Sequence, residues 1–188
     1  MNFFKLRKLK KEIVPSILRG EVGVFPTDTI YGIVGCALDK KAVERIYQIK
    51  KRNAIKPLII LVSSRNDLKT FGIKINRKQK KFLKQVWPGK VSVVVDCENE
   101  NFFYLHRGTR SLAFRVPKDR WLRNFLKSSG PLVAPSANPE GEKPARTKDE
   151  AKYYFGNQVD FYIDFGKLEN EPSIIVKLFD NGEYQILR

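Results

Sequence analysis

The chain has 188 residues, of which 42% are hydrophobic and 30% charged, a balance typical of a globular protein and not of a disordered one. No apolar run approaches the roughly 18 residues that a membrane span needs, so we expect no membrane contact through a transmembrane helix. The net charge of +16, from 36 Lys and Arg against 20 Asp and Glu, favours nucleotides, nucleic acid or acidic membranes as partners.

The first third of the chain alternates between helical and strand patterns. The basic residues 1–11 have no signal-peptide core, which predicts a cytoplasmic protein. A helix disturbed at Pro15 comes before two short strands, and Gly32 and Gly35 would allow another segment to approach the second strand closely. The patterns predict helices over 7–18 and 40–52 and strands over 22–25, 30–34 and 57–62.

Two adjacent lysines are distinguished by the period of the helix over 40–52. Val43, Ile46, Tyr47 and Lys50 follow helical spacing along one face, whereas Lys51 belongs to the opposite, polar side. A lysine on an inward face needs a partner for its ammonium. The alternative is that Lys50 only extends its charge to solvent at the helix end.

The remainder of the chain alternates irregularly between helices and strands. Thr147 and Glu150 form a capping-box pattern at the start of the last helix. Together the patterns predict one α/β domain over 1–188, with a twisted mixed sheet flanked by helices. We expect helices around 64–71, 76–86, 118–128 and 148–155, strands over 91–95, 112–116, 132–134, 160–164, 174–179 and 184–187, and loops over 96–108 and 135–147.

Several familiar catalytic devices are missing. Cys36 and Cys97 lie in apolar sequence, which suits reduced core thiols, although a disulfide between them stays open. With one histidine, His106, neither a structural zinc site nor a serine triad is expected. The glycine-rich phosphate-binding motifs are also absent.

The remaining candidate functional side chains are cations and small groups that donate hydrogen bonds. Lys50, Arg52 and Lys56 lie within seven residues of one another. Such side chains bind and orient a polyphosphate and do not attack it, and nucleotidyl transfer can be catalysed in this way. Further candidates are the cations Arg110, Arg115, Arg146 and Arg188 and the small donors Ser111, Ser136, Asn138 and Thr147.

These residues belong to motifs that resemble those of the YrdC/TsaC family, in order over nearly the whole chain. Pro26-Thr27-Asp28-Thr29-Ile30-Tyr31-Gly32 resembles its opening motif. The other segments that resemble motifs of this family are Ile46 to Arg52 with Lys56-Pro57-Leu58, Trp87-Pro88-Gly89, Arg115-Val116-Pro117, Pro135-Ser136-Ala137-Asn138, Pro172-Ser173-Ile174-Ile175 and Ile186-Leu187-Arg188.

The resemblance implies a short, single-domain enzyme with a basic concave face. Such an enzyme makes threonylcarbamoyl-adenylate and pyrophosphate from L-threonine, bicarbonate and ATP, with Mg²⁺ carried on the phosphates. Partner proteins then transfer the group to a tRNA adenosine beside the anticodon. The implied catalytic residues are Lys50, Arg52, Ser136 and Asn138; the implied ATP contacts are Lys50, Arg52, Lys56, Ser111, Asn138, Arg146 and Arg188; the implied threonine contacts are Thr29, Arg115, Ser136 and Ser173.

Three positions depart from the family pattern, namely Leu61, Glu140 and Ile174. Glu140 would put a carboxylate beside the phosphate site. Two alternatives also remain: a basic module that binds RNA or tRNA without chemistry, and a carbamoyl-transfer domain of hydrogenase-maturation type. The latter normally accompanies acylphosphatase and zinc-finger segments, which this sequence does not contain.

Overall fold

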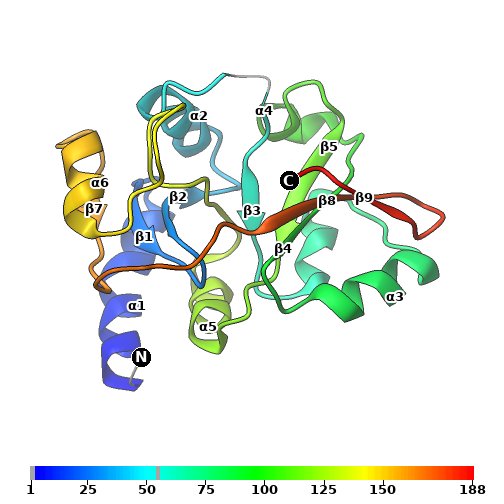
Figure 1. Ribbon diagram of the computed structural model, residues 1–188, viewed down its shortest axis with the longest axis horizontal. Helices are drawn as coiled ribbons and strands as arrows, with labels where there is room; N and C mark the ends of the chain where they lie inside the picture. Colours follow the sequence, from blue (N-terminus) through cyan, green and yellow to red (C-terminus); the bar gives the residue numbers. More distant parts are fainter. Residues whose placement is uncertain (1–2, 54–55) are drawn as a thin grey trace.

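The computed structural model describes residues 3–53 and 56–188, which form one mixed sheet with helices on both faces (Figure 1). The helices are α1 (Phe3–Leu18), α2 (Lys40–Ile49), α3 (Arg77–Val86), α4 (Phe103–His106), α5 (Arg120–Ser129) and α6 (Lys148–Phe155), with 3₁₀ turns η1 (Arg65–Phe71) and η2 (Glu100–Phe102). The strands are β1 (Gly23–Pro26), β2 (Tyr31–Cys36), β3 (Ile59–Leu61), β4 (Val91–Asp96), β5 (Ser111–Arg115), β6 (Leu132–Val133), β7 (Phe161–Tyr162), β8 (Ile174–Leu178) and β9 (Tyr184–Ile186).

The sheet runs in the order β7-β1-β2-β6-β3-β5-β4-β8-β9. β1 and β2 form an antiparallel hairpin, whereas β3 pairs with β5, and β4 with β8, in parallel. Both pair types occur in one sheet, so the predicted mixed sheet is confirmed. Because few sequence neighbours are also spatial neighbours, the chain crosses the sheet repeatedly and brings distant turns to one edge.

Side chains of the sheet divide between two apolar cores. Along β2, Ile33 packs into the core under α2, α3 and η1, and the next residue, Val34, packs into the core under α1 and α5. This alternation is the period of two that a strand imposes. In the second core Phe25 packs against Phe125 of α5, with ring centroids 4.7 Å apart.

The layer formed by α1 and α5 covers only half of its face of the sheet. Ile59 and Leu61 of β3 contact this layer. Farther along the same face, Ala113 of β5 is paired with Ile59, and Val94 of β4 is paired with Ala113. Ala113 and Val94 line an open cavity instead of packing against the α1 and α5 layer. The cavity therefore lies where the helical layer ends.

Helix α2 is shorter than expected and ends at Ile49. Asp39 caps its start by accepting hydrogen bonds from the N–H groups of Lys41 and Ala42, as N-cap aspartates do. Lys51 has a φ of 49°, a left-handed conformation that helices do not continue through. The prediction that Lys50 points inward and Lys51 outward is nevertheless confirmed, since Lys50 is 2% exposed and Lys51 is exposed.

Other predictions need correction. The expected loop over 96–108 contains η2 and α4, and the side chain of Asn99 caps the first of these short turns. Turns this short show no apolar periodicity in the sequence, so the pattern did not predict them. Pro15 does not interrupt α1; it lies exposed on the outer side, where water can satisfy the carbonyl it leaves unpaired. The capping box of α6 is half formed: Thr147 accepts from the N–H of Glu150, whose carboxylate binds the N–H of Arg146.

Both cysteines are free, Cys97 buried and Cys36 partly buried, so no disulfide joins them. Among the described residues, no helix is both long and apolar enough to cross a membrane.

Candidate active site

A cavity of about 320 Å³ opens on the uncovered half of the sheet. Its floor is formed by Ile59, Val94 and Ala113, and its walls come from the turn after β1, the turn after β6 and the segment before β8. Seven side chains implied by the sequence line it: Thr29, Arg52, Ser111, Arg115, Ser136, Ser173 and Arg188.

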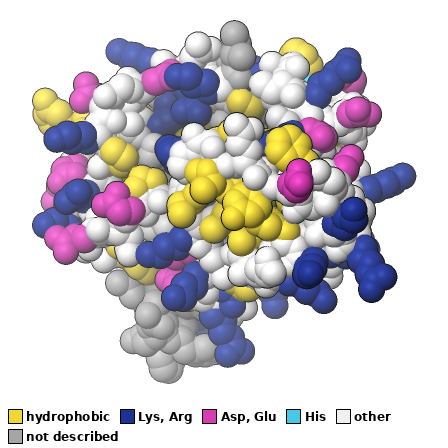
Figure 2. All heavy atoms as spheres, turned by 45° about the vertical axis from the view of Figure 1, so that its right-hand side comes forward, with side chains coloured by type: hydrophobic (Ala, Val, Ile, Leu, Met, Phe, Trp, Pro, Cys, Tyr) yellow, Lys and Arg dark blue, Asp and Glu magenta, His cyan; other side chains and the backbone are white. Residues whose placement is uncertain are grey.

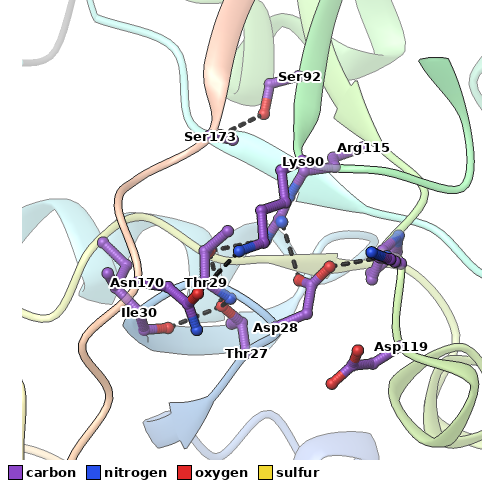
Figure 3. A network of polar contacts seen from close by, with 12 residues as sticks. Thr27, Asp28, Thr29, Ile30, Lys90, Ser92, Arg115, Asp119, Asn170 and Ser173 are labelled. Carbon is purple, nitrogen blue, oxygen red and sulfur yellow. Dashed lines mark hydrogen bonds and ion pairs between the residues drawn. The ribbon is translucent and has the colours of Figure 1, made fainter.

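Arg115 lies at the end of β5 and is nearly fully buried, with 4% of its surface exposed. Its Nη1 donates to Asp28 at 2.8 Å and its Nη2 to the Thr29 hydroxyl at 3.3 Å (Figure 3). Its Nε is buried without a hydrogen-bond partner among the described residues. Burial lowers the pKa of Arg115, and Asp28 opposes this shift. The guanidinium is held rigidly and has donor capacity left for a ligand.

The turn that carries Thr29 is fixed by its own hydroxyls. Thr27 Oγ1 accepts from the N–H of Thr29 and donates to the Ile30 carbonyl, at 3.1 and 2.7 Å. On the opposite wall Ser173 shares a 2.8 Å hydrogen bond with Ser92, as Figure 3 shows. Arg188 donates to the carbonyl of Ser173. Hydroxyl donors are therefore positioned on two sides of Arg115.

Lys50 does not line the cavity. Its Nζ donates to the carbonyl of Ser136 at 2.5 Å and to the carbonyl of Asn138. Burial, and then the charge of Arg52, lower the pKa of Lys50 to about 7. A lysine so placed fixes the Ser136–Asn138 turn, which also pairs with Gly32 of β2.

Lys56 lies outside the cavity lining and forms an ion pair with Glu140 at 2.5 Å. The other Glu140 oxygen accepts from the N–H of Asn53 at 2.6 Å. These bonds lower the pKa of Glu140, Lys56 contributing most. Arg52 donates to the carbonyls of Lys56 and Pro57 at 3.2 and 3.3 Å, and burial lowers its pKa.

Two further predicted contacts also lie off the cavity. Asn138 is buried and donates to the carbonyls of Pro139 and Glu142. Arg146 is exposed. Of the departures from the family pattern, Leu61 packs in the core under α1 and α5, and Ile174 is 51% exposed. Neither lines the cavity.

Sequence reasoning missed Asp28 and Thr27, which hold Arg115 and Thr29 in place. Asp28 also accepts from the N–H of Lys118 at 2.7 Å. One signal in the sequence could have found Asp28: it and Arg115 are opposite charges in or beside otherwise apolar segments. A buried arginine requires a carboxylate partner.

The cavity is electropositive. Arg52, Arg115 and Arg188 contribute to its lining, and none of the described lining residues is acidic. Clefts of one charge sign concentrate ligands of the opposite sign. Three guanidinium groups with hydroxyls between them suit a ligand that carries a carboxylate and phosphates.

Comparison with known proteins identifies relatives of this chain. The family model Sua5/YciO/YrdC, described as telomere recombination, matches residues 16–188. A putative threonylcarbamoyl-AMP synthase of Methanocaldococcus jannaschii is 32% identical over 94% of this chain and 81% of its own length. The threonylcarbamoyl-AMP synthase of Pyrococcus abyssi is 30% identical over 87% of this chain, which spans about half (48%) of that relative.

The fold is also similar to solved structures. The crystal structure of P. abyssi Sua5 complexed with L-threonine superposes with a TM-score of 0.87 at 28% identity, covering 97% of this chain and 54% of that one. The predicted α/β architecture is therefore confirmed at the level of the whole fold.

Proposed function

The chain belongs to the Sua5/YciO/YrdC family, and on that premise we propose that it is a threonylcarbamoyl-AMP synthase. The amine of L-threonine and bicarbonate give a carbamate and water. A carbamate oxygen then attacks the α-phosphorus of ATP, and pyrophosphate leaves. The reaction needs no protein nucleophile, in keeping with a cavity of arginines and hydroxyls.

The observation that carries the proposal is the convergence of seven distant side chains on one cavity. We assign the threonine carboxylate to Arg115, whose partner Asp28 orients it, and the threonine hydroxyl and amine to the hydroxyl groups of Thr29 and Ser173, whose oxygens can accept from an N–H. Arg52 and Arg188 suit the phosphates, where fixed cations stabilise the charge that develops in transfer.

Lys50 and Asn138 have a different part in this proposal. They act as positioning residues, because Lys50 binds the carbonyls of Ser136 and Asn138 instead of facing the cavity. Lys56 becomes available to a phosphate only when Glu140 releases it. In this proposal Arg146, which is exposed, contacts ATP from the protein surface.

We place Mg²⁺ on the ATP phosphates. No group of three or more His, Cys, Asp or Glu among residues 3–53 and 56–188 could hold a metal ion, so the ion would travel with its nucleotide. The bound ion supplies charge neutralisation at the phosphates. Transfer of the product to tRNA by partner proteins, and a cytoplasmic location, belong to the same proposal.

The alternative is a basic module that binds RNA without chemistry. It gives no reason for a buried Arg115–Asp28 pair beside a cavity of hydroxyls. The decisive measurement is pyrophosphate release from ATP by the purified protein, with L-threonine and bicarbonate omitted in turn. We expect release only when both are present. Pyrophosphate release that continues when L-threonine or bicarbonate is omitted, or no release when both are present, would contradict the proposal.

A further inference from the structure

Two side chains of α2 and one that follows α4 form a polar cluster outside the cavity. Tyr47 is 5% exposed, and its hydroxyl donates to the carbonyl of Lys56 at 3.0 Å. The guanidinium carbon of Arg107 lies 4.1 Å from the centre of the Tyr47 ring, and Nη2 of Arg107 donates to Glu44 at 2.8 Å. None of the three is among the described residues that line the cavity. We call Glu44, Tyr47 and Arg107 the α2 brace.

One end of the α2 brace reaches Arg52. The Lys56 carbonyl that accepts from Tyr47 also accepts from Nε of Arg52 at 3.2 Å, and Nη2 of Arg52 donates to the carbonyl of Pro57 at 3.3 Å. Nη1 of Arg52 makes no hydrogen bond with the described residues, and the side chain lines the cavity. The Tyr47 hydroxyl therefore fixes the peptide group that holds the Arg52 guanidinium, whose remaining donors are left for a ligand.

The other end of the α2 brace fixes the loop over 107–110, between α4 and β5. Arg107 and Arg110 have φ angles of 51° and 49°, a left-handed conformation that is costly for residues other than glycine. Such backbone persists where surrounding contacts fix it, and the brace supplies those contacts at Arg107. The loop leads to Thr109 and Ser111, which line the same cavity as Arg52. One helix thus braces two walls of the cavity.

Burial keeps the α2 brace in its bonding form. It raises the pKa of Tyr47, an effect that Arg107 opposes, so the hydroxyl stays protonated and can donate to the Lys56 carbonyl. The side chain of Arg107 is 14% exposed, and a guanidinium over an aromatic ring is attracted by the face of that ring. In Figure 2, which is turned from Figure 1 about the vertical axis, Lys and Arg side chains gather near the top, at the level of α2 and α4. This end of the molecule attracts anions.

We propose that the α2 brace positions Arg52 for the phosphates of ATP, with Tyr47 and Arg107 as positioning residues. The inference rests on the proposed function, in which Arg52 meets those phosphates. A cation that is already held in place loses less conformational freedom when the ligand binds. If Tyr47 served only as a core aromatic, phenylalanine would pack equally well in its place. The inference therefore depends on the hydroxyl and on the cation that lies over the ring.

The first test removes the Tyr47 hydroxyl and keeps the ring. Tyr47→Phe is compared with Tyr104→Phe, because Tyr104 is partly buried and its hydroxyl also donates to a carbonyl, that of Ala37, at 3.0 Å. Isothermal titration calorimetry of the full chain measures the Kd for Mg-ATP and, separately, the Kd for L-threonine. We expect Tyr47→Phe to raise the Kd for ATP about fivefold, the effect of one lost hydrogen bond. The Kd for ATP in Tyr104→Phe, and the Kd for threonine in both variants, should equal those of the parent.

The second test removes the cation over the ring. Arg107→Met is compared with Arg45→Met, because Arg45 belongs to α2 and also pairs with a carboxylate, that of Asp160. We expect Arg107→Met to raise the Kd for ATP about threefold and Arg45→Met to leave it unchanged. Since Arg107 acts through Tyr47, the double variant with Tyr47→Phe should lose less than the product of the two single effects. In pyrophosphate release, KM for ATP should rise with the Kd while kcat changes less.

Four results would overturn the inference: no ATP binding by the parent, equal Kd values for ATP in Tyr47→Phe and Tyr104→Phe, equal weakening of ATP and threonine in Tyr47→Phe, or fully multiplicative effects in the double variant. Equal weakening of both ligands would assign Tyr47 a role in the fold alone. A parent that binds ATP and releases no pyrophosphate would contradict the proposed function, and the binding comparison would still decide the role of the α2 brace.

Discussion

At the scale of single residues, the buried pair of Arg115 and Asp28 matters most for both stability and chemistry. The two groups are 2.8 Å apart, with 4% and 1% of their side chains exposed. A charge buried this deeply depends on its partner. Any ligand carboxylate that reaches Arg115 must therefore share the guanidinium with Asp28, which limits its approach to the side occupied by Nε and Nη2.

We predict that Asp28→Asn lowers the free energy of unfolding by about 3 kcal/mol, because it leaves the Arg115 charge buried and unpaired. Urea unfolding of the variant and of Asp119→Asn would measure this. Asp119 is partly exposed, and among the described residues its carboxylate bonds only to the Trp121 indole. A loss in Asp28→Asn no larger than in this control would show that the pair does not stabilise the fold.

Glu140 limits the charge that Lys56 can offer a phosphate. The two form a 2.5 Å pair, and the carboxylate also binds the N–H of Asn53. We predict that Glu140→Gln lowers the KM for ATP several-fold, because an amide competes more weakly than a carboxylate for the ammonium. Glu142→Gln, an exposed neighbour whose backbone carbonyl makes the Asn138 contact, should leave KM unchanged. An unchanged or higher KM in Glu140→Gln would assign that carboxylate a purely structural role.

At the scale of elements, β2 serves both the site and the core. A Cβ on Gly32 would lie 3.1 Å from the carbonyl of Pro135, beside the Ser136 turn, whereas one on Gly35 would meet Ile46 and Val22 at 3.0 and 3.1 Å. We predict that Gly32→Ala reduces kcat/KM about tenfold by displacing Ser136, and that Gly35→Ala mainly lowers the unfolding midpoint.

The paired measurements are steady-state pyrophosphate release and thermal unfolding of both variants. If Gly32→Ala lost stability and kept its activity, the close approach of β2 to the Ser136 turn would be irrelevant to turnover.

The helical period of α2 was enough to predict that Lys50 faces inward and Lys51 outward. It could not predict the end of α2 at Ile49, because that end depends on the backbone conformation of Lys51. The turns of η2 and α4 were missed since three or four residues carry no measurable period. The Glu140–Lys56 pair joins residues 84 positions apart, and only the folded chain reveals such a contact.

At the scale of the whole molecule, the buried Lys50 couples stability to pH. The pKa of Lys50 is lowered to about 7 by burial, and a lysine in the unfolded chain titrates near 10.4. Between these values the unfolded chain binds the additional proton, so the free energy of unfolding rises with pH. This contribution is lost as pH falls towards 7.

We predict that the unfolding free energy gains about 1–2 kcal/mol from pH 7 to pH 9 relative to Lys50→Met, which lacks the titrating group. Lys51→Met, the exposed neighbour, should keep the dependence of the parent. Urea unfolding at both pH values measures the difference. Identical pH dependence in the parent and in Lys50→Met would mean that Lys50 stays charged throughout this range.

The order of elements and the mixed sheet followed from sequence patterns over most of the chain, because apolar periods of two and 3.6 are local. The site was predicted less completely. Residues of the cavity wall, such as Thr29 and Ser173, could be named from motifs, but the partners that fix them, Asp28 and Ser92, emerge only from the strand order.

The half-covered sheet has a consequence for how the site meets its substrates. The floor residues Ile59, Val94 and Ala113 belong to strands that are paired with a neighbouring strand on both sides, so the floor is preorganised by folding itself. The walls come from turns, which are held by side-chain hydrogen bonds such as those of Thr27 at the Thr29 turn and of Lys50 at the Ser136 turn. The floor thus belongs to the sheet and the walls to its connections, so related chains could acquire new substrates by altering the turns alone.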